Sequence, residues 1–492
     1  MLASDRLRAE PSRRQLAAAW LAVPFAVFLA VYAPAVGRGF ISDDFRWIVE
    51  SRIDRVADIP TIFSRHTGFY RPVVALTFAA DYALFGNRPR GYGLTNLALA
   101  LACAGLFAAL LQSLGMPLPA ALLGAALWLL NFHGIAMALL WISGRTALVL
   151  TAAALAAAIA LVRGRIVIAA LCLLIALFAK EEAVTLPVTL GCWMLVLGGR
   201  RYPGRVGRRF TLWIVLSFTA LAIYLLLRAH SGALTPASAP PYYRFTFAPS
   251  VVARHFLQYA DRSMTLPTAA CLVAFLLLRP PPRPASLVEL PASAKAPARF
   301  SEGGPLRSRP GVSWDLIGCG ALWLAGGYAL TMFLPIGSSL YACFPSIGAC
   351  IMAADVCLAL WRRAEPRARG RAAIAGVALV MALVPVYLAR NQRWTELASF
   401  SSAVLDRLEA LTSDVPERAA VVLLDERSQR VNLESTFGTL LDDAYALKTG
   451  RSVVLWVEPP LGNADLAGLR PPCAGCVAKT LQVRDGTLEA VR

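Results

Sequence analysis

The sequence is poor in charge. Only 16% of its 492 residues are Asp, Glu, Lys or Arg, it contains 4 His, and 57% of its residues are hydrophobic, with a mean hydropathy of +0.58. A water-soluble chain does not carry repeated uncharged apolar runs of about 20 residues, whereas a bilayer requires them. The composition therefore excludes a soluble globular protein and predicts an integral membrane protein with many spans.

Signals for nucleic-acid binding are also missing, although the formal net charge is +18. The basic residues lie in short clusters between apolar runs, and no aromatic-basic recognition motif accompanies them. Lys and Arg are retained on the cytoplasmic side of membrane proteins, so these clusters indicate topology. We expect no nucleic-acid partner.

Metal-binding patterns are sparse. Of 10 cysteines, only Cys473 and Cys476 form a CxxC pair, and no second pair or histidines complete a zinc site. This pair is either an extracytoplasmic disulfide or two unused thiols. The adjacent carboxylates of Asp43 and Asp44 could ligate a divalent ion, but two carboxylates alone do not specify one. The sequence also contains no internal repeat of about 30 to 50 residues.

Apolar segments predict about eleven transmembrane helices. They cover residues 16–36, 92–111, 118–141, 146–161, 166–178, 183–197, 210–227, 266–278, 316–334, 340–361 and 372–388. A cleaved signal peptide would have a shorter apolar region than the first segment, so we expect an uncleaved span with a cytoplasmic N-terminus (1–15). The transmembrane domain is predicted at 16–389, with a cytoplasmic linker at 279–313 that is rich in Pro and Ala.

Elements outside the membrane are expected on the side opposite the cytoplasm. Residues 72–85 and 251–263 are too short or too polar to cross, which favours two interfacial helices. Residues 390–492 resemble a small soluble α/β domain, with helices at 394–411 and 433–447, strands at 419–424 and 452–457, and a hairpin turn at Asp485-Gly486. The predicted fold class is an all-α polytopic membrane protein with a C-terminal extracytoplasmic α/β domain.

The outer loop, residues 38–91, places Asp43 and Asp44 just beyond the first span. Acidic residues often only solvate a loop, but ionisable groups at a membrane exit are functional candidates by default. A carboxylate there could remove a proton from an acceptor hydroxyl, provided that cations stabilise a departing phosphate. This pattern favours transfer from a phosphate-linked lipid, with Asp43 or Asp44 as the general base.

Further polar residues fall on the same predicted side. Candidates for binding the donor phosphate are Arg145, Lys180 and Arg390, and candidates for supporting or acceptor-binding roles are His66, Arg71, Asp81, His133, Glu181 and Tyr341. Each also has a structural interpretation. Basic residues at helix ends commonly extend toward water, Glu181 and Glu182 could pair with Lys180, and a histidine at a helix end is commonly satisfied by its neighbours.

Five segments in order give the chain a family resemblance. They are GFISDDF (39–45), YRPVVALTFAADYALFGNRPRGYGLTN (70–96), WISGRT (141–146), AKEE (179–182) and LYACFPSIG (340–348) followed by RNQRW (390–394). The chain resembles the GT-C superfamily of membrane glycosyltransferases, in particular the tetratricopeptide-repeat transmembrane O-mannosyltransferases and bacterial relatives of glycosyltransferase family 39. The resemblance implies a polyprenyl-phosphate sugar donor, inversion at the anomeric carbon, and Asp43 as the base with Asp44 beside it.

The chain departs from the family pattern at three positions. Ala136 and Ala138 replace a histidine and a glutamate that follow His133 in relatives, and Ala147 replaces an acidic residue. The C-terminus lacks tetratricopeptide repeats, so the acceptor, whether glycan, lipid or protein, stays open. The sequence predicts an inverting glycosyltransferase of the mannosyltransferase type. The alternatives are a flippase for a lipid-linked substrate and an inactive binding protein of the same fold.

Overall fold

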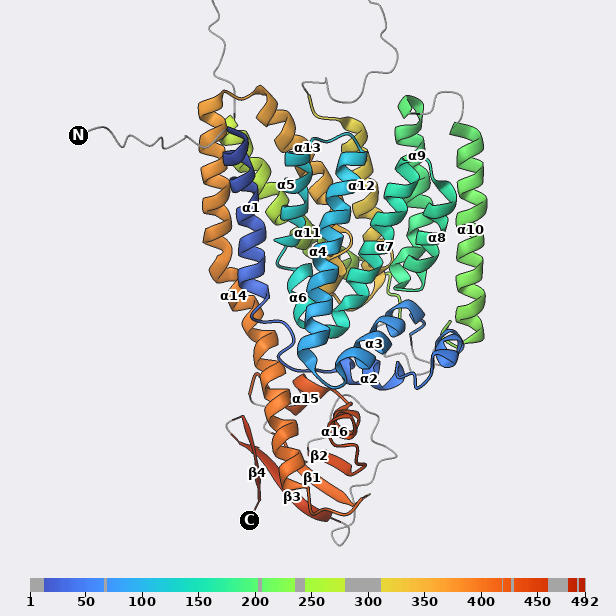
Figure 1. Ribbon diagram of the computed structural model, residues 1–492, viewed down its shortest axis with the longest axis vertical. Helices are drawn as coiled ribbons and strands as arrows, with labels where there is room; N and C mark the ends of the chain where they lie inside the picture. The colour runs from blue at the N-terminus through green and yellow to red at the C-terminus, as the bar shows by residue number, and fades with distance from the viewer. Residues whose placement is uncertain are drawn as a thin grey trace, which may run out of the picture.

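A bundle of helices carries a small sheet domain at one end (Figure 1). The computed structural model describes residues 13–65, 69–201, 206–234, 244–278, 311–417, 419–425, 429–458, 477–484 and 486–491. The bundle helices are α1 (Arg13–Tyr32), α4 (Pro89–Ser113), α5 (Leu118–Leu129), α7 (Arg145–Val162), α8 (Ile166–Leu177), α9 (Leu186–Arg201), α10 (Val206–His230), α11 (Pro249–Leu278), α12 (Trp314–Tyr328), α13 (Ser346–Arg363) and α14 (Pro366–Leu411). A short helix, α6 (Gly134–Leu140), lies between α5 and α7. The chain is a multi-pass membrane protein, as its composition predicts.

The predicted number of spans is not confirmed. Among the described residues, 6 helices are long and apolar enough to cross a membrane, or 7 if α5 and α6, which are bent by 68°, form one broken span. Several bundle helices are short: α8 has 12 residues, which is roughly 18 Å of helix. The break between α5 and α6 falls at the polar and aromatic residues 131–133 that interrupt the predicted third span.

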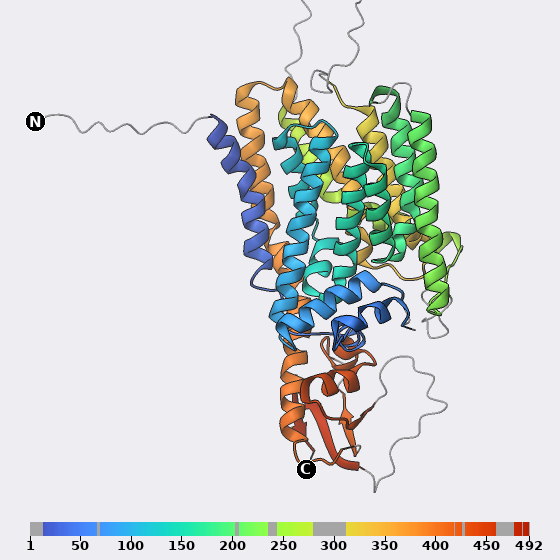
Figure 2. The ribbon, with the colours of Figure 1, turned by 45° about the vertical axis from the view of Figure 1, so that its right-hand side comes forward.

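The outer loop folds into two helices that lie across the end of the bundle (Figures 1 and 2). These are α2 (Asp43–Glu50) and α3 (Pro72–Phe85), and α3 has the bounds predicted for an interfacial helix. Proline at the first position of α3 favours this start, because its missing N–H needs no partner there. The second predicted interfacial helix is not separate: residues 251–263 and the following span form one helix, α11, with Pro267 inside it.

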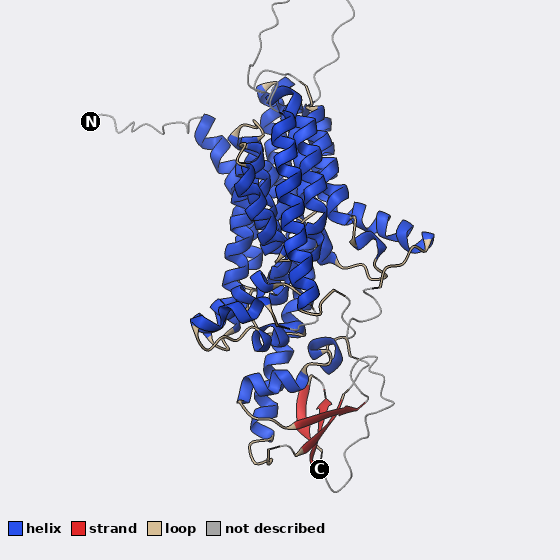
Figure 3. Ribbon diagram, turned by 90° about the vertical axis from the view of Figure 1, so that its right-hand side faces the viewer, coloured by secondary structure: helices blue, strands red, loops and turns tan. Residues whose placement is uncertain are grey.

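The C-terminal domain contains the strands of the structure (Figure 3). The strands β1 (Ala420–Leu424), β2 (Val454–Glu458), β3 (Val477–Arg484) and β4 (Thr487–Ala490) form a sheet in the order β2-β1-β3-β4. Strand β1 is parallel to β2 and β3, while β3 and β4 form an antiparallel hairpin at the predicted turn, where Gly486 has φ +76°. Two helices, α15 (Leu433–Phe437) and α16 (Leu441–Thr449), connect β1 to β2.

Helix α14 joins the bundle to this domain without a break. It has 46 residues and includes both the predicted eleventh span and the predicted outer helix at 394–411, so the domain boundary expected at residue 390 lies inside a helix. Residues 389–394 contain neither glycine nor proline, and nothing in them ends the helix. The domain therefore lies at the same end of the bundle as α2 and α3, opposite the N-terminal end of α1 (Figure 1).

Candidate active site

Asp43 and Asp44 occupy the first turn of α2. Carboxylates are favoured there because the unpaired backbone N–H groups of a helix start carry partial positive charge. The two side chains face different surroundings. Asp43 is exposed, whereas Asp44 is fully buried. Of the two carboxylates, that of Asp43 is therefore the one accessible from solvent.

Three hydrogen bonds hold the Asp44 carboxylate inside the protein. Its Oδ1 accepts from the backbone N–H of Ser143 at 2.7 Å and from the Ser143 hydroxyl, and its Oδ2 accepts from the backbone N–H of Ile41 at 3.0 Å. Burial raises the pKa of Asp44 to about 7, even though these hydrogen bonds favour the ionised form. Asp44 thus connects the start of α2 to the turn that precedes α7.

Replacing Asp44 with Asn should reduce the pH dependence of stability. Native Asp44 keeps its proton to a higher pH than the unfolded chain, so the native state binds more protons between about pH 4 and pH 7. The contribution of Asp44 to the free energy of unfolding therefore decreases as the pH rises through this window and is constant above it. Thermal unfolding in detergent should show this decrease in the wild type and in the exposed-residue control Asp54→Asn, and a smaller decrease in Asp44→Asn, because burial also raises the pKa of other carboxyl groups such as Asp43.

Asp43 reaches solvent while protein surrounds much of it. Partial desolvation raises the pKa of Asp43, and the guanidinium groups of Arg46 and Arg71 act in the opposite direction. A carboxylate with a raised pKa is a better proton acceptor than an unperturbed one. Of the two predicted bases, Asp43 is the one that a substrate in solution can reach.

Arg71 belongs to a cluster of two arginines around one carboxylate. Its Nη2 lies 2.8 Å from Oε2 of Glu181, and its Nε lies 3.1 Å from the same oxygen. On the other side, Nη1 of Arg228 lies 3.3 Å from Oε1 of Glu181. All three side chains are half-buried or more, and the two guanidinium groups share this one carboxylate.

Aromatic rings surround this cluster. The Arg71 guanidinium lies 4.4 Å from the centroid of the Phe69 ring, and Arg228 lies 5.8 Å from that of Tyr224. Tyr70 and Phe178 pack against Tyr224, with ring centroids 6.2 and 6.3 Å away. Aromatic faces attract the guanidinium groups above them and help to hold the arginine side chains in place.

Arg145 has a different environment, because it is fully buried in an ion pair with Asp81. Its Nη2 contacts Oδ2 of Asp81 at 2.5 Å, and its Nε donates to Oδ1 of Asn96 at 2.9 Å. The guanidinium also lies 4.3 Å from the centroid of the Phe78 ring. The pair fastens α3 to α4 and α7, and the structure does not bring Arg145 to an exposed position.

The other predicted residues form two further groups. Lys180 is buried, with Nζ 2.7 Å from Oε1 of Glu182 and 5.0 Å from the centroid of the Tyr341 ring. Arg390 is exposed, and its Nη1 lies 3.2 Å from Nδ1 of His133. His66, Cys473 and Cys476 lie outside the described residues.

Two residues of the site were not among the sequence candidates. Ser143, inside the WISGRT segment, binds Asp44, and Arg228 completes the cluster around Glu181. Arg228 could have been found from the predicted topology, because a basic residue at the predicted outer end of a span runs against the positive-inside bias. No sequence signal marks the contact of Ser143 with Asp44, since 99 residues separate them.

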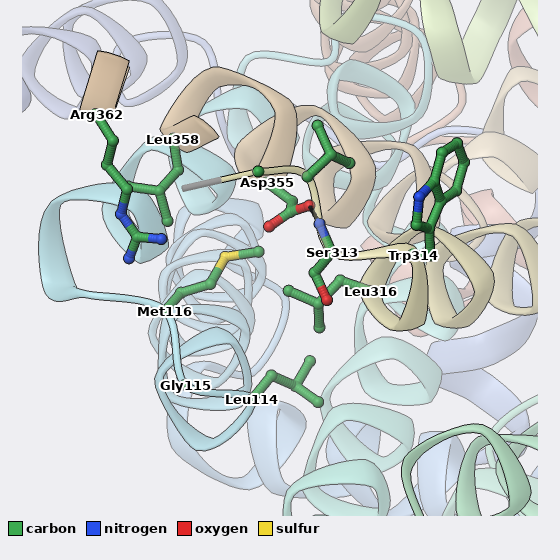
Figure 4. Close-up of a pocket in the computed structure, with 11 residues that line it drawn as sticks. Leu114, Gly115, Met116, Ser313, Trp314, Leu316, Asp355, Leu358 and Arg362 are labelled. Carbon is green, nitrogen blue, oxygen red and sulfur yellow. Dashed lines mark hydrogen bonds between the residues drawn. The ribbon is translucent and has the colours of Figure 1, made fainter. Parts of the chain in front are cut away.

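The described residues contain no group of three or more His, Cys, Asp or Glu side chains placed to hold a metal ion. A small pocket does exist, but it lies where α4 meets α5 and α12 begins, at the end of the bundle away from α3 (Figure 4). Its polar groups include Asp355, which accepts from the backbone N–H of Ser313 at 2.7 Å, and Arg362. None of the predicted site residues lines it.

Among known proteins, solved structures share the fold of this chain, whereas sequence comparisons find no relative. No protein-family model matches the chain, and no curated protein sequence matches it. Its fold is similar to that of solved ArnT structures, which agrees with the sequence resemblance to the GT-C membrane glycosyltransferases. The chain is similar to crystal structures of ArnT from Cupriavidus metallidurans, a GT-C glycosyltransferase that transfers 4-amino-4-deoxy-L-arabinose.

The similarity extends over most of both proteins. The apo structure of ArnT has 14% sequence identity and a TM-score of 0.52, and the match covers 89% of this chain and 86% of ArnT. The structure of ArnT bound to undecaprenyl phosphate has 14% identity and a TM-score of 0.51, covering 91% of this chain and 86% of ArnT. At this identity the similarity defines the fold, and the chemistry depends on the residues described above.

Proposed function

We propose that the chain is an inverting glycosyltransferase that moves one sugar from a polyprenyl phosphate to an acceptor hydroxyl at the periplasmic face of a bacterial inner membrane. The observation that carries this proposal is the exposed carboxylate of Asp43, whose nearest cationic influences include Arg71 of the two-arginine cluster. The fold shared with ArnT, one structure of which contains undecaprenyl phosphate, supports the same class of donor.

The proposed reaction needs one base and one anion site. Asp43 accepts the proton of the acceptor hydroxyl as its oxygen bonds to the anomeric carbon from the face opposite the phosphate. The bond between the anomeric carbon and the phosphate oxygen breaks, and its electron pair leaves with the phosphate. The negative charge that develops there is stabilised by Arg71 and Arg228, which Glu181 holds in fixed positions. Asp44 positions the start of α2.

The three cationic residues that the sequence suggests as ligands of the donor phosphate have different roles in this proposal. Arg390 is exposed and remains a candidate for contact with a lipid phosphate. Arg145 and Lys180 are buried against carboxylates, so we assign them a structural role in which they hold neighbouring segments of the protein together. Asp81 and Glu182 supply the compensating charges, and Tyr341 packs on Lys180.

A transfer assay tests the proposal. Membranes that contain the chain are incubated with a panel of undecaprenyl-phosphate-linked hexoses, pentoses and aminopentoses, and extracted lipids, glycans and proteins are analysed by mass spectrometry. We expect one donor to lose its sugar to a new product, with undecaprenyl phosphate released in equal amount. Comparison of the same extracts from a deletion strain should show the missing glycan. If no donor is consumed and the strain's glycans are unchanged, the proposal is wrong.

Arg71→Ala should weaken binding of undecaprenyl phosphate by about 10- to 100-fold, because one charge-assisted hydrogen bond to phosphate contributes about 1.5–3 kcal/mol. Glu181 keeps Arg228 as a partner, so the variant leaves no unpaired carboxylate. Arg71→Lys keeps the charge but loses the two-pronged geometry, and an intermediate affinity is expected. Titration calorimetry in detergent measures the affinity of both variants.

Arg46→Ala, which replaces an exposed arginine on α2, is the matched control. An equal loss of affinity in Arg46→Ala and Arg71→Ala would contradict a specific role for Arg71.

A further inference from the structure

Ser42, immediately before Asp43, has a strained backbone. Its φ is +49° and its ψ is −125°, and it is the one described residue other than glycine with a positive φ. A side chain at Cβ makes this region costly, and a non-glycine residue stays there only when its surroundings hold it. Because Ser42 sets the direction in which α2 begins, its conformation determines where Asp43 points.

The groups that hold Ser42 come from the C-terminal domain. The backbone N–H of Ser42 donates to the carbonyl oxygen of Thr436 at 2.8 Å, and Thr436 lies in α15. One turn further along α2, the ring of Phe45 stacks on that of Phe437 with centroids 5.8 Å apart. Both rings are buried, with exposed fractions of 1% and 0%.

The segment just before Ser42 contacts the C-terminal part of α14, which holds it in place. A Cβ on Gly39 would lie 2.2 Å from the carbonyl oxygen of Ala398, so only glycine fits against this helix. The Ser402 hydroxyl donates to the carbonyl of Arg38 at 3.3 Å. Ile41 packs on Leu397 and Ala398 in a small buried cluster. Contacts from α14 and α15 therefore enclose residues 38–45 on two sides.

We propose that the C-terminal domain is part of the active site as a positioning element: the Thr436 carbonyl and the Phe437 ring hold Ser42 in its strained conformation and thereby direct Asp43 toward the acceptor. Phe437 is thus a positioning residue that acts through α2. The catalytic part of this inference rests on the proposed function, whereas the contact between domain and loop does not.

The test is a double-variant cycle with Phe437→Ala, Ser42→Gly and the combination of both. Loss of the Phe437 ring releases the strained segment, and a misplacement of about 1 Å at a reacting group costs about 100-fold in rate. We expect Phe437→Ala to lower kcat by about 10- to 100-fold with the KM for the donor changed by less than about threefold. Glycine adopts a positive φ at no steric cost, so Ser42→Gly added to Phe437→Ala should recover at least about fivefold in kcat.

Hydrogen exchange measured by mass spectrometry gives a readout that does not need turnover. Amides of residues 41–50 should exchange at least about tenfold faster in Phe437→Ala and slow again when Ser42→Gly is added. Leu481→Ala, which truncates a buried side chain of β3 in the same domain, is the matched control and should leave exchange in 41–50 unchanged. Phe437→Leu, which keeps apolar volume, provides the same comparison at smaller amplitude if Phe437→Ala does not fold.

The outcomes separate the two proposals. If exchange in 41–50 responds as expected but no sugar donor is ever consumed, the domain holds the loop and the glycosyltransferase function is wrong. If transfer is observed but Phe437→Ala and Leu481→Ala alter kcat and exchange equally, or if Ser42→Gly gives no recovery, the positioning role of the domain is overturned.

Discussion

Asp43→Asn is expected to lower kcat/KM for sugar transfer by about 10²- to 10⁴-fold, the usual contribution of a general base. The amide has nearly the same shape as the carboxylate but cannot accept a proton at neutral pH. Because Asp43 is exposed and its closest cations keep their other partners, neither folding nor binding of undecaprenyl phosphate should change. Steady-state transfer rates in membranes, together with donor titration, measure the two effects separately.

Asp54→Asn is the matched control for this experiment. Asp54 is an exposed aspartate of the same outer loop, and its loss should change kcat/KM by less than about twofold, as for most exposed surface substitutions. A variant Asp43→Asn that transfers sugar at the wild-type rate would remove Asp43 from the reaction. A variant that loses donor binding as well would place it in the donor site instead.

Arg145→Met is expected to destabilise the protein by about 3–5 kcal/mol, because it leaves the carboxylate of Asp81 buried without its partner. The loss should appear as a lower temperature of thermal unfolding in detergent. Arg163→Met, at an exposed position after the end of α7, is the control and should have little effect.

The double variant Asp81→Leu/Arg145→Met distinguishes a structural role from phosphate binding. Replacing both members of a buried ion pair with apolar side chains is often neutral, so most of the lost stability should return. The double variant should also bind undecaprenyl phosphate with the affinity of the wild type. A double variant that is stable but does not bind undecaprenyl phosphate would show that Arg145 contacts the donor.

Local patterns in the sequence were sufficient for much of the fold. The bounds of α3 follow from Pro72 and the glycine after Phe85, and the order of helices and strands in the C-terminal domain follows from alternating apolar residues and the turn at Gly486. The continuity of α14 was missed. A change from apolar to polar composition near residue 390 indicates the end of a membrane environment, but it does not end a helix.

The partners of the candidate site residues could not be predicted from the sequence. Topology from basic clusters assigns a residue to one end of the bundle, but it does not give the direction in which the residue points around that bundle. The sequence therefore grouped Arg71, Arg145 and Lys180 together, and the structure distributes them among three separate carboxylates. The pair of Arg71 with Glu181 spans 110 positions in the sequence. Only packing of the helices determines such partners.

Helix α14 has a mechanical consequence for the C-terminal domain. With 46 residues it is roughly 69 Å long, and within it a single proline, Pro385, interrupts the backbone hydrogen bonding. A rod of this length converts a small change of tilt within the lipid into a larger displacement at its far end. Since helices tilt to match the hydrocarbon thickness around them, we expect the hydrogen bond between Ser42 and Thr436 of α15 to respond to the lipid composition of the membrane.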